Sequence, residues 1–195
     1  MGALDDLEHV PVETRAQWRR WLQRHHATSP GIWLVTWRTG SGKPVVDYEA
    51  ICEEAICFGW VDSRPGKVDA ERTKILVTPR KRGAKWSRPN KERVARLEAA
   101  GRLAPAGVAV IDQAKADGSW TALDAVEDLV VPDDLAAAFA AHLGSAGHWE
   151  AFPRSVKRGI LEWIVSAKKP ETRAARVDQT AEMAARNERA NQWRK

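Results

Sequence analysis

The sequence is poor in cysteine, and its two cysteines form no recognisable metal or redox motif. Cys52 and Cys57 are the only two among 195 residues, and they stand five positions apart. On a helix this spacing places them on different sides, so they match neither a metal knuckle nor a C-x-x-C redox pair. We therefore expect reduced, structural thiols, no metal or other cofactor, and a reducing compartment.

Long apolar runs are absent as well. The chain has no apolar run long enough for a membrane helix, and its N-terminal segment carries early acidic residues instead of a signal-peptide core. We therefore expect no membrane span and a cytoplasmic location. Apolar residues make up 44% and charged residues 29%, which is typical of globular proteins, so most of the chain should fold.

Phenylalanine and tyrosine are scarce, whereas tryptophan is abundant. The chain has three Phe, one Tyr and ten Trp. An indole ring offers a large apolar area and one N–H donor. Tryptophan therefore suits a hydrophobic core, which is the expected place for any single one here, and also a site that stacks a flat or cationic ligand.

Acidic residues are scarce in one segment of the chain. From Arg64 to Arg102, thirteen Lys or Arg stand against four Asp or Glu, whereas the whole chain has a net charge of +5. A basic segment on an otherwise mildly acidic chain predicts a local surface that attracts anions. The plain alternative is a solvated basic face without a ligand.

The N-terminal half shows both helical and strand patterns. A helix follows the N-cap candidate Thr14, and a strand with two apolar faces, hence an inner strand, is predicted over 31–38. A second helix begins after Asp47 and stops at Gly59. Two further strands are predicted over the basic hairpin region, where the Pro65–Gly66 pair is a β-turn signal.

After Asn90 the apolar pattern is helical almost to the end. The fold class predicted is α+β, with a small antiparallel N-terminal sheet with packed helices and an all-α C-terminal region. We expect an α+β domain over 1–101 and a helical domain over 102–195, with a soft boundary. The helices are predicted at 90–101, 105–118, 132–144, 153–169 and 170–188.

The segment 78–90, "TPRKRGAKWSRPN", is the strongest candidate for a binding site. Pro79 should end a strand, and the basic loop (residues 80–87) then precedes a helix that Ser87 or Asn90 would start. A helix N-terminus beside several cations favours an anion, and Trp86 offers a stacking face. If the strands pair as hairpins, Trp60, Asp62 and Ser63, at the start of the first of these two strands, could approach this loop. The candidate ligand-binding residues are Trp60, Asp62, Ser63, Arg80, Lys81, Arg82, Lys85, Trp86, Ser87 and Asn90.

No catalytic or metal-binding residue stands out. The carboxylates Glu49, Glu53 and Glu54 share one predicted helix without a neighbouring histidine, so an exposed face in water is expected. The "GSG" stretch before Lys43 is too short for a Walker-type phosphate loop. The histidines that could act as a general base stand in no Ser or Cys constellation, and they are His25, His26, His142 and His148.

Four stretches together resemble the bacterial YdeI/OmpD-associated, or bacteriocin-protection, family. They are "GIWLVTWRTGSGK", "DYEAICEEAICFGWVDSR", "TPRKRGAKWSRPNKERVARLEAAGRLAPAG" and "EWIVSAKKPETRAARV", and the resemblance runs from about residue 12 to 187. It implies a role in resistance to antimicrobial peptides and an outer-membrane association, but no defined reaction. The last stretch includes Arg173 and Arg176, which we expect to pair with acidic residues of the N-terminal half.

Several functions fit these features. The first is a non-enzymatic cytoplasmic protein that binds a small aromatic or anionic ligand, such as an antimicrobial compound, through the basic loop. The second is a nucleic-acid binder that uses the segment 64–102 to contact phosphates and Trp to stack on bases, although no helix-turn-helix, zinc finger or RNP motif is present. The others are an enzyme of unassigned chemistry and a partner-docking protein. The oligomeric state is left open.

Overall fold

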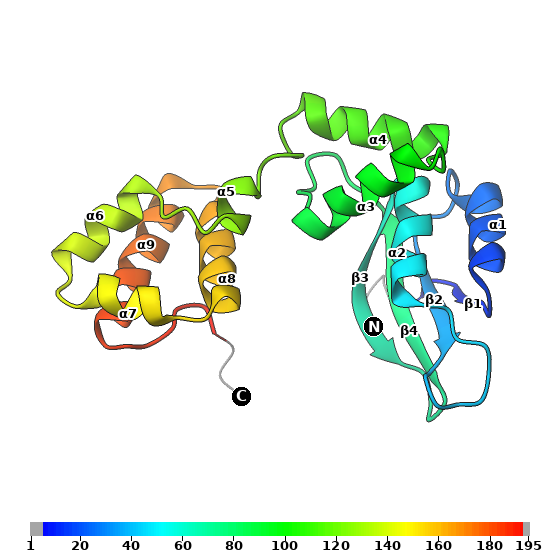
Figure 1. Ribbon diagram of the computed structural model, residues 1–195, viewed down its shortest axis with the longest axis horizontal. Coiled ribbons are helices and arrows are strands. Elements are labelled where there is room, and N and C mark those ends of the chain that lie inside the picture. Colours follow the sequence, from blue (N-terminus) through cyan, green and yellow to red (C-terminus); the bar gives the residue numbers. More distant parts are fainter. Residues whose placement is uncertain (1–5, 193–195) are drawn as a thin grey trace. The chain divides into compact units, whose positions relative to one another are not determined.

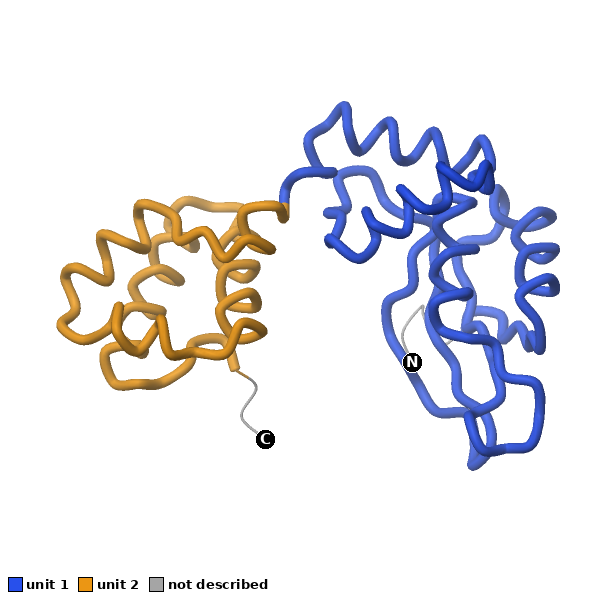
Figure 2. The backbone as a smooth tube through the Cα atoms, in the orientation of Figure 1, with its two compact units in different colours: residues 1–122 blue, residues 123–195 orange. Residues whose placement is uncertain are grey.

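The computed structural model describes residues 6–192. The chain divides into two compact units, residues 1–122 and 123–195 (Figure 2). The division lies within the soft boundary expected near 101–130, and the helix that follows Gly101 packs with the N-terminal elements. Backbone atoms of this helix approach those of an earlier one, and a Cβ on Gly107 would lie 2.3 Å from the carbonyl oxygen of Cys57.

The described part of unit 1 combines a four-stranded sheet with four helices (Figure 1). Its elements are β1 (His9–Pro11), α1 (Arg15–His25), β2 (Ile32–Trp37), α2 (Tyr48–Cys57), β3 (Trp60–Lys67), β4 (Arg72–Pro79), α3 (Arg88–Ala99) and α4 (Pro105–Ala116). The described part of unit 2 is helical, with α5 (Asp124–Glu127), α6 (Asp133–Ala141), α7 (Ser145–Ala151), α8 (Arg154–Val165) and α9 (Pro170–Ala185). The α+β prediction is confirmed.

The sheet has the strand order β1-β2-β4-β3. Strands β2, β4 and β3 pair antiparallel, with Leu34 opposite Ile75 and Asp62 opposite Val77. The inner position of β2 is as predicted. Strand β1 pairs parallel to β2, so the sheet is mixed rather than purely antiparallel. A three-residue edge strand that ends at Pro11 is too short to show the alternation by which a strand is recognised.

The β3–β4 hairpin turns later than the sequence pattern predicts. Pro65 and Gly66 lie within β3, where the pairing shifts register between Asp62 and Pro65 as in a β-bulge. The chain reverses instead at Asp69, whose carboxylate accepts hydrogen bonds from the backbone N–H groups of Glu71 and Arg72. Strand β3 lies at the edge of the sheet, where a proline can be placed without removing a ladder hydrogen bond. The Pro-Gly pair therefore lies beside the bulge and not in the turn.

One apolar core holds unit 1 together. Trp18 and Leu22 of α1 pack in it with Ile51 and Ala55 of α2 and with Leu34 of β2, and all five are buried. The apolar faces of both helices therefore pack against the sheet in this core.

Thr14 is the N-cap of α1, as predicted, and its hydroxyl accepts the Gln17 N–H in a capping box.

The carboxylates of α2 are not an exposed face in water, which corrects the sequence prediction. Glu54 has no exposed surface, and it forms ion pairs with Arg15, Arg19 and Arg102. Glu53 lies 2.8 Å from the Arg15 guanidinium. The helical period alone cannot show this arrangement, because the three arginines come from other elements, at both ends of unit 1.

Unit 2 has a core of its own, formed largely by α8 and α9. Ile160 and Ile164 of α8 pack with Val177 and Ala181 of α9, which is consistent with the predicted amphipathic helices. Helix α7 was not predicted, since Gly144 and Gly147 interrupt its pattern. Unlike α8, it has few large apolar residues.

The two arginines of α9 find their partners within unit 2. Arg173 forms an ion pair with Asp134 of α6 at 2.7 Å. Arg176 donates to the carbonyl of Trp163 and, at 2.9 Å, to the hydroxyl of Ser166. Ion pairing is thus confirmed for Arg173, but the expected partner in the N-terminal half is wrong.

Candidate functional site

The basic loop connects β4 to α3, as the sequence predicted. The Arg80 N–H donates to the carbonyl of Gly59, the residue before β3, at 2.9 Å, which ties the start of the loop to the start of that strand. Ser87 is the N-cap of α3, although its hydroxyl makes no capping hydrogen bond. Asn90 lies inside α3, where its side-chain oxygen accepts from Arg93 at 2.7 Å. Asn90 is therefore not the helix start, and its side-chain oxygen is already hydrogen-bonded to Arg93.

Arg80 and Trp86 form the buried base of the loop. Arg80 is 9% exposed and Trp86 is 1% exposed, and the guanidinium carbon lies 3.8 Å from the centre of the indole ring. The Nη1 group of Arg80 donates to the carbonyl of Lys85 at 3.1 Å. Burial lowers the pKa of Arg80 to about 10, so the side chain is still a cation at neutral pH.

Neither predicted tryptophan offers a surface for stacking. Trp86 is covered by Arg80 and by Trp120, whose ring centre lies 5.1 Å away. Trp60 is 1% exposed, and its indole N–H donates to the His26 carbonyl. Both rings belong to the unit 1 core, because burial removes the large apolar area of an indole from water.

The other predicted residues are spread along different surfaces. Lys81 and Arg82 are exposed in the basic loop, and Lys85 is half-buried. Asp62 and Ser63 lie on β3, where Asp62 accepts a hydrogen bond from Tyr48 and the Ser63 hydroxyl donates to the Leu76 carbonyl. Only Arg80, Lys81, Arg82 and Trp86 of the predicted set line a common cavity.

That cavity lies between the basic loop and one face of α4, and we call it the loop pocket. Its volume is about 210 Å³. It is lined by Arg80, Lys81, Arg82, Gly83, Ala84, Trp86, Ala109, Val110, Gln113, Ala114, Asp117 and Ser119. The loop thus contributes the cations, and α4 contributes mostly small apolar side chains.

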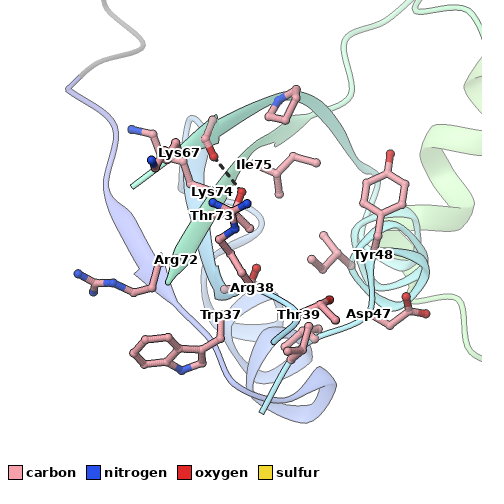
Figure 3. A pocket seen from close by; sticks show the side chains of 16 residues that line it. Trp37, Arg38, Thr39, Asp47, Tyr48, Lys67, Arg72, Thr73, Lys74 and Ile75 are labelled. Atoms are coloured by element: carbon pink, nitrogen blue, oxygen red, sulfur yellow. Dashed lines mark hydrogen bonds between the residues drawn. The ribbon is translucent and has the colours of Figure 1, made fainter. Parts of the chain in front are cut away.

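A larger hollow lies beside the N-terminus of α2, and we call it the groove (Figure 3). Its volume is about 810 Å³. Side chains from β2, β4, the end of β3, the loop after β2 and the first turn of α2 line it. They are Thr36, Trp37, Arg38, Thr39, Val45, Val46, Asp47, Tyr48, Ile51, Pro65, Gly66, Lys67, Arg72, Thr73, Lys74 and Ile75.

The groove has an apolar wall on the α2 side. Tyr48 is 53% exposed and Val45 is 45% exposed, and they are two of the six large hydrophobic side chains that are exposed among the described residues. The Tyr48 hydroxyl donates to Asp62 at 2.6 Å. Partial desolvation and the Asp62 carboxylate raise the pKa of Tyr48, so the phenol stays neutral and its ring is held in place.

The cations of the groove differ in whether a neighbouring side chain already pairs with their charge. Arg72 forms an ion pair with Asp69 at 2.7 Å, and the ammonium of Lys74 lies 4.3 Å from the centre of the Trp33 ring. In residues 6–192 no acidic partner is found for Arg38 or Lys67, and both are exposed. The groove therefore has two available cations beside an apolar wall.

Sequence reasoning missed the groove as a site. Lys67, Arg72 and Lys74 were part of the basic segment, but nothing in the pattern set them apart from the loop cations. Antiparallel pairing places Lys67 opposite Thr73, while α2 brings Tyr48 to the same hollow. The helical pattern favoured a buried position for Tyr48, the single Tyr in the chain, and only the structure shows that it is 53% exposed.

The described residues offer no evident metal centre or reactive thiol. Among them no group of three or more His, Cys, Asp or Glu side chains is placed to hold a metal ion. Burial, with the nearby Asp62 carboxylate, raises the pKa of the Cys52 thiol to about 12, which leaves it protonated and unreactive. Over residues 6–192, none of the helices combines the length and hydropathy needed to cross a bilayer.

Comparison with known families divides the chain much as the structure does. Residues 10–110 match the family described as Domain of unknown function (DUF8412), and residues 128–187 match the family described as Bacteriocin-protection, YdeI or OmpD-Associated. The predicted family is confirmed, but over unit 2 and not from residue 12, since only the stretch 162–177 among the four resembling stretches lies in that match. No curated protein and no solved structure matches the chain.

Proposed function

Because the chain belongs to the family described as Domain of unknown function (DUF8412), its chemistry has to come from its own residues, and we propose that it is a binding protein for an amphipathic anion. The ligand has an apolar or aromatic body and at least one acidic group. It occupies the groove beside Tyr48. The observation that carries this proposal is the combination of an exposed apolar wall with two cations that have no acidic partner among the described residues.

The size and the lining of the groove fit a small molecule. Small-molecule sites are hollows of roughly 300–1,000 Å³ with apolar walls and a few convergent polar groups. The groove, at about 810 Å³, lies within this range. Ile51, Ile75 and Tyr48 give it apolar surface, and Figure 3 shows Ile75 and Tyr48 among the side chains that line it. An aromatic body would bury this surface on binding, and that burial supplies the main stabilisation.

The cations select the charge of the ligand. Arg38 follows β2 and Lys67 ends β3, so two separate elements bring them to one hollow. The lining has one carboxylate, on Asp47, against the four cations Arg38, Lys67, Arg72 and Lys74. A planar guanidinium such as that of Arg38 matches a carboxylate, sulfonate or phosphate oxygen pair.

The family of unit 2 gives the binding a context. Unit 2 carries a region of the bacteriocin-protection family. We propose that the protein protects by sequestering an antimicrobial compound with the chemistry described above. The two cysteines are free and buried, which is compatible with the reducing cytoplasm that we propose as its compartment.

Nucleic-acid binding has less support from the same cations. At least three of the thirteen cations of the basic segment are neutralised within unit 1 by acidic residues from outside it, because Arg93 and Arg96 pair with Glu49 and Arg102 pairs with Glu54. The negative partners lie outside the segment 64–102, so its high charge in sequence does not translate into an equally high surface charge.

The test uses the fluorescent anion 8-anilinonaphthalene-1-sulfonate, which has an aromatic body and one sulfonate. We expect saturable binding to the full chain, weakened roughly tenfold by the double variant Arg38→Ala/Lys67→Ala and by Tyr48→Ala. The matched control is Lys81→Ala/Arg82→Ala, which removes the same charge from the basic loop. Equal affinity of all variants would refute the groove. Binding of oligonucleotides in place of the dye, lost at high salt, would favour nucleic acid.

A further inference from the structure

We propose that the loop pocket is a second binding site. It takes a small oxyanion such as inorganic phosphate between Arg80 and the face of α4 that lines the pocket. This site is separate from the groove, and its ligand does not need an apolar body. The proposal therefore stands or falls independently of the function proposed for the groove.

The first argument is a set of buried donors that have no acceptor. The Nε and Nη2 groups of Arg80 are buried and make no hydrogen bond, and the same holds for the indole N–H of Trp86. Buried polar groups in folded proteins are almost always hydrogen-bonded. The unpartnered groups of Arg80 and Trp86 are all donors, and the two side chains are in contact. The missing partner is therefore an acceptor.

The second argument is the charge around the loop pocket. Arg80 is nine-tenths buried, and no carboxylate forms an ion pair with it in residues 6–192. The Asp62 carboxylate acts on the pKa of Arg80 only through its charge, and it already accepts a hydrogen bond from the Tyr48 hydroxyl. A buried cation without a counter-charge is costly, and the Trp86 ring compensates for only part of that cost.

The lining adds further positive charge. Lys81 and Arg82 stand at the loop side of the pocket, and Asp117 is the single carboxylate in its lining. Asp117 lies 4.0 Å from the exposed Arg82 and accepts the backbone N–H of Ser119. Three cations therefore face one carboxylate, and the net charge of the lining favours an anion.

Size and burial define the class of anion. A cavity of about 210 Å³ fits a small oxyanion but not a nucleotide chain or a folded partner. Ala109, Val110 and Ala114 of α4 close the opposite wall with small apolar groups. The guanidinium of Arg80 is not on the surface, where a nucleic-acid backbone would contact it, so a free small ion is the better occupant.

The experiment follows the indole N–H resonances of the ¹⁵N-labelled full chain during titration with inorganic phosphate at constant ionic strength, with chloride as the reference. The Trp86 signal is assigned with Trp86→Phe. We expect a saturable shift of the Trp86 resonance. Lys81→Ala/Arg82→Ala should weaken phosphate binding roughly threefold to tenfold, and Arg80→Met, checked for folding by circular dichroism, should abolish it.

The matched control removes two cations from the groove. Arg38→Ala/Lys67→Ala should leave the phosphate response of Trp86 unchanged, although it weakens dye binding in the groove. The proposal is overturned if wild type shows no saturable shift, if folded Arg80→Met keeps the shift, or if the groove variant loses it equally. A shift caused by an oligonucleotide and not by phosphate would also overturn it.

Discussion

The guanidinium carbon of Arg80 lies 3.8 Å from the centre of the Trp86 ring, and the two buried side chains come from the two ends of the same loop. This pair converts a loop that looks solvated in the sequence into part of the unit 1 core. The cation is covered by an aromatic face rather than by a carboxylate. The stability of this loop and the anion binding proposed for it therefore depend on the same two side chains.

Replacing the ring should expose how much of the core depends on it. We expect Trp86→Ala to reduce the free energy of unfolding by about 3–5 kcal/mol, because it opens a cavity and uncovers Arg80. Urea denaturation of the full chain measures the loss. A reduction below about 1 kcal/mol would mean that Trp86 does not carry core packing.

The buried carboxylate of Glu54 should be critical for folding. It has no exposed surface and pairs with Arg15, Arg19 and Arg102. Glu54→Gln keeps the shape but removes the charge, so we expect a loss of about 3–5 kcal/mol in the free energy of unfolding. The exposed Glu98→Gln changes the charge of the chain equally and should cost less than about 0.5 kcal/mol. Equal losses would refute the role of Glu54.

Glu49 should make stability depend on pH in the acid range. The hydrogen bond from Arg93 holds the pKa of Glu49 below its usual value, with help from Arg96. A lowered folded-state pKa stabilises above the ordinary glutamate pKa, and this stabilisation is lost as pH falls through the lowered value.

Thermal melts of wild type and Glu49→Gln therefore give a direct check. Wild type should be more stable at neutral pH by less than about 1 kcal/mol, since the pair is partly exposed. The difference in melting temperature should shrink toward zero as the pH is lowered. A difference that stays constant from neutral to acid pH would contradict the ion-pair explanation.

Two glycines offer a contrast between close packing and open space. A Cβ on Gly107 would lie 2.3 Å from the Cys57 carbonyl oxygen, so Gly107→Ala should force α4 away from α2 and destabilise unit 1 by more than about 1 kcal/mol. Gly159 in α8 has no atom within 4 Å of that position. Gly159→Ala should stabilise its helix by about 0.5–1 kcal/mol. Opposite signs in urea denaturation would confirm both; the same sign would contradict one.

Local signals in the sequence predicted most of the helices and strands. The N-cap at Thr14, the left-handed stop at Gly59 and the proline that opens α9 are all properties of a few neighbouring residues. Local rules failed where the needed signal was short or ambiguous, as for β1 and for the Pro65–Gly66 pair.

The candidate sites show a sharper division. The sequence correctly placed Arg80, Lys81 and Arg82 in one basic loop, but it treated Trp86 as a free stacking face. Whether an indole points to solvent or into a core depends on elements far away in the chain. Here Trp120, which follows α4, closes the space above Trp86.

The sequence by itself determined the α+β class, the basic segment and the family of unit 2, because composition, periodicity and motif order are readable along the chain. Only the tertiary structure decided which charges are free. It brought Arg15, Arg19 and Arg102 onto Glu54, and it left Arg38 without an acidic partner in the described part of the chain. Electrostatic pairing acts over a few ångströms in space, and the residues that meet are dozens of positions apart in sequence.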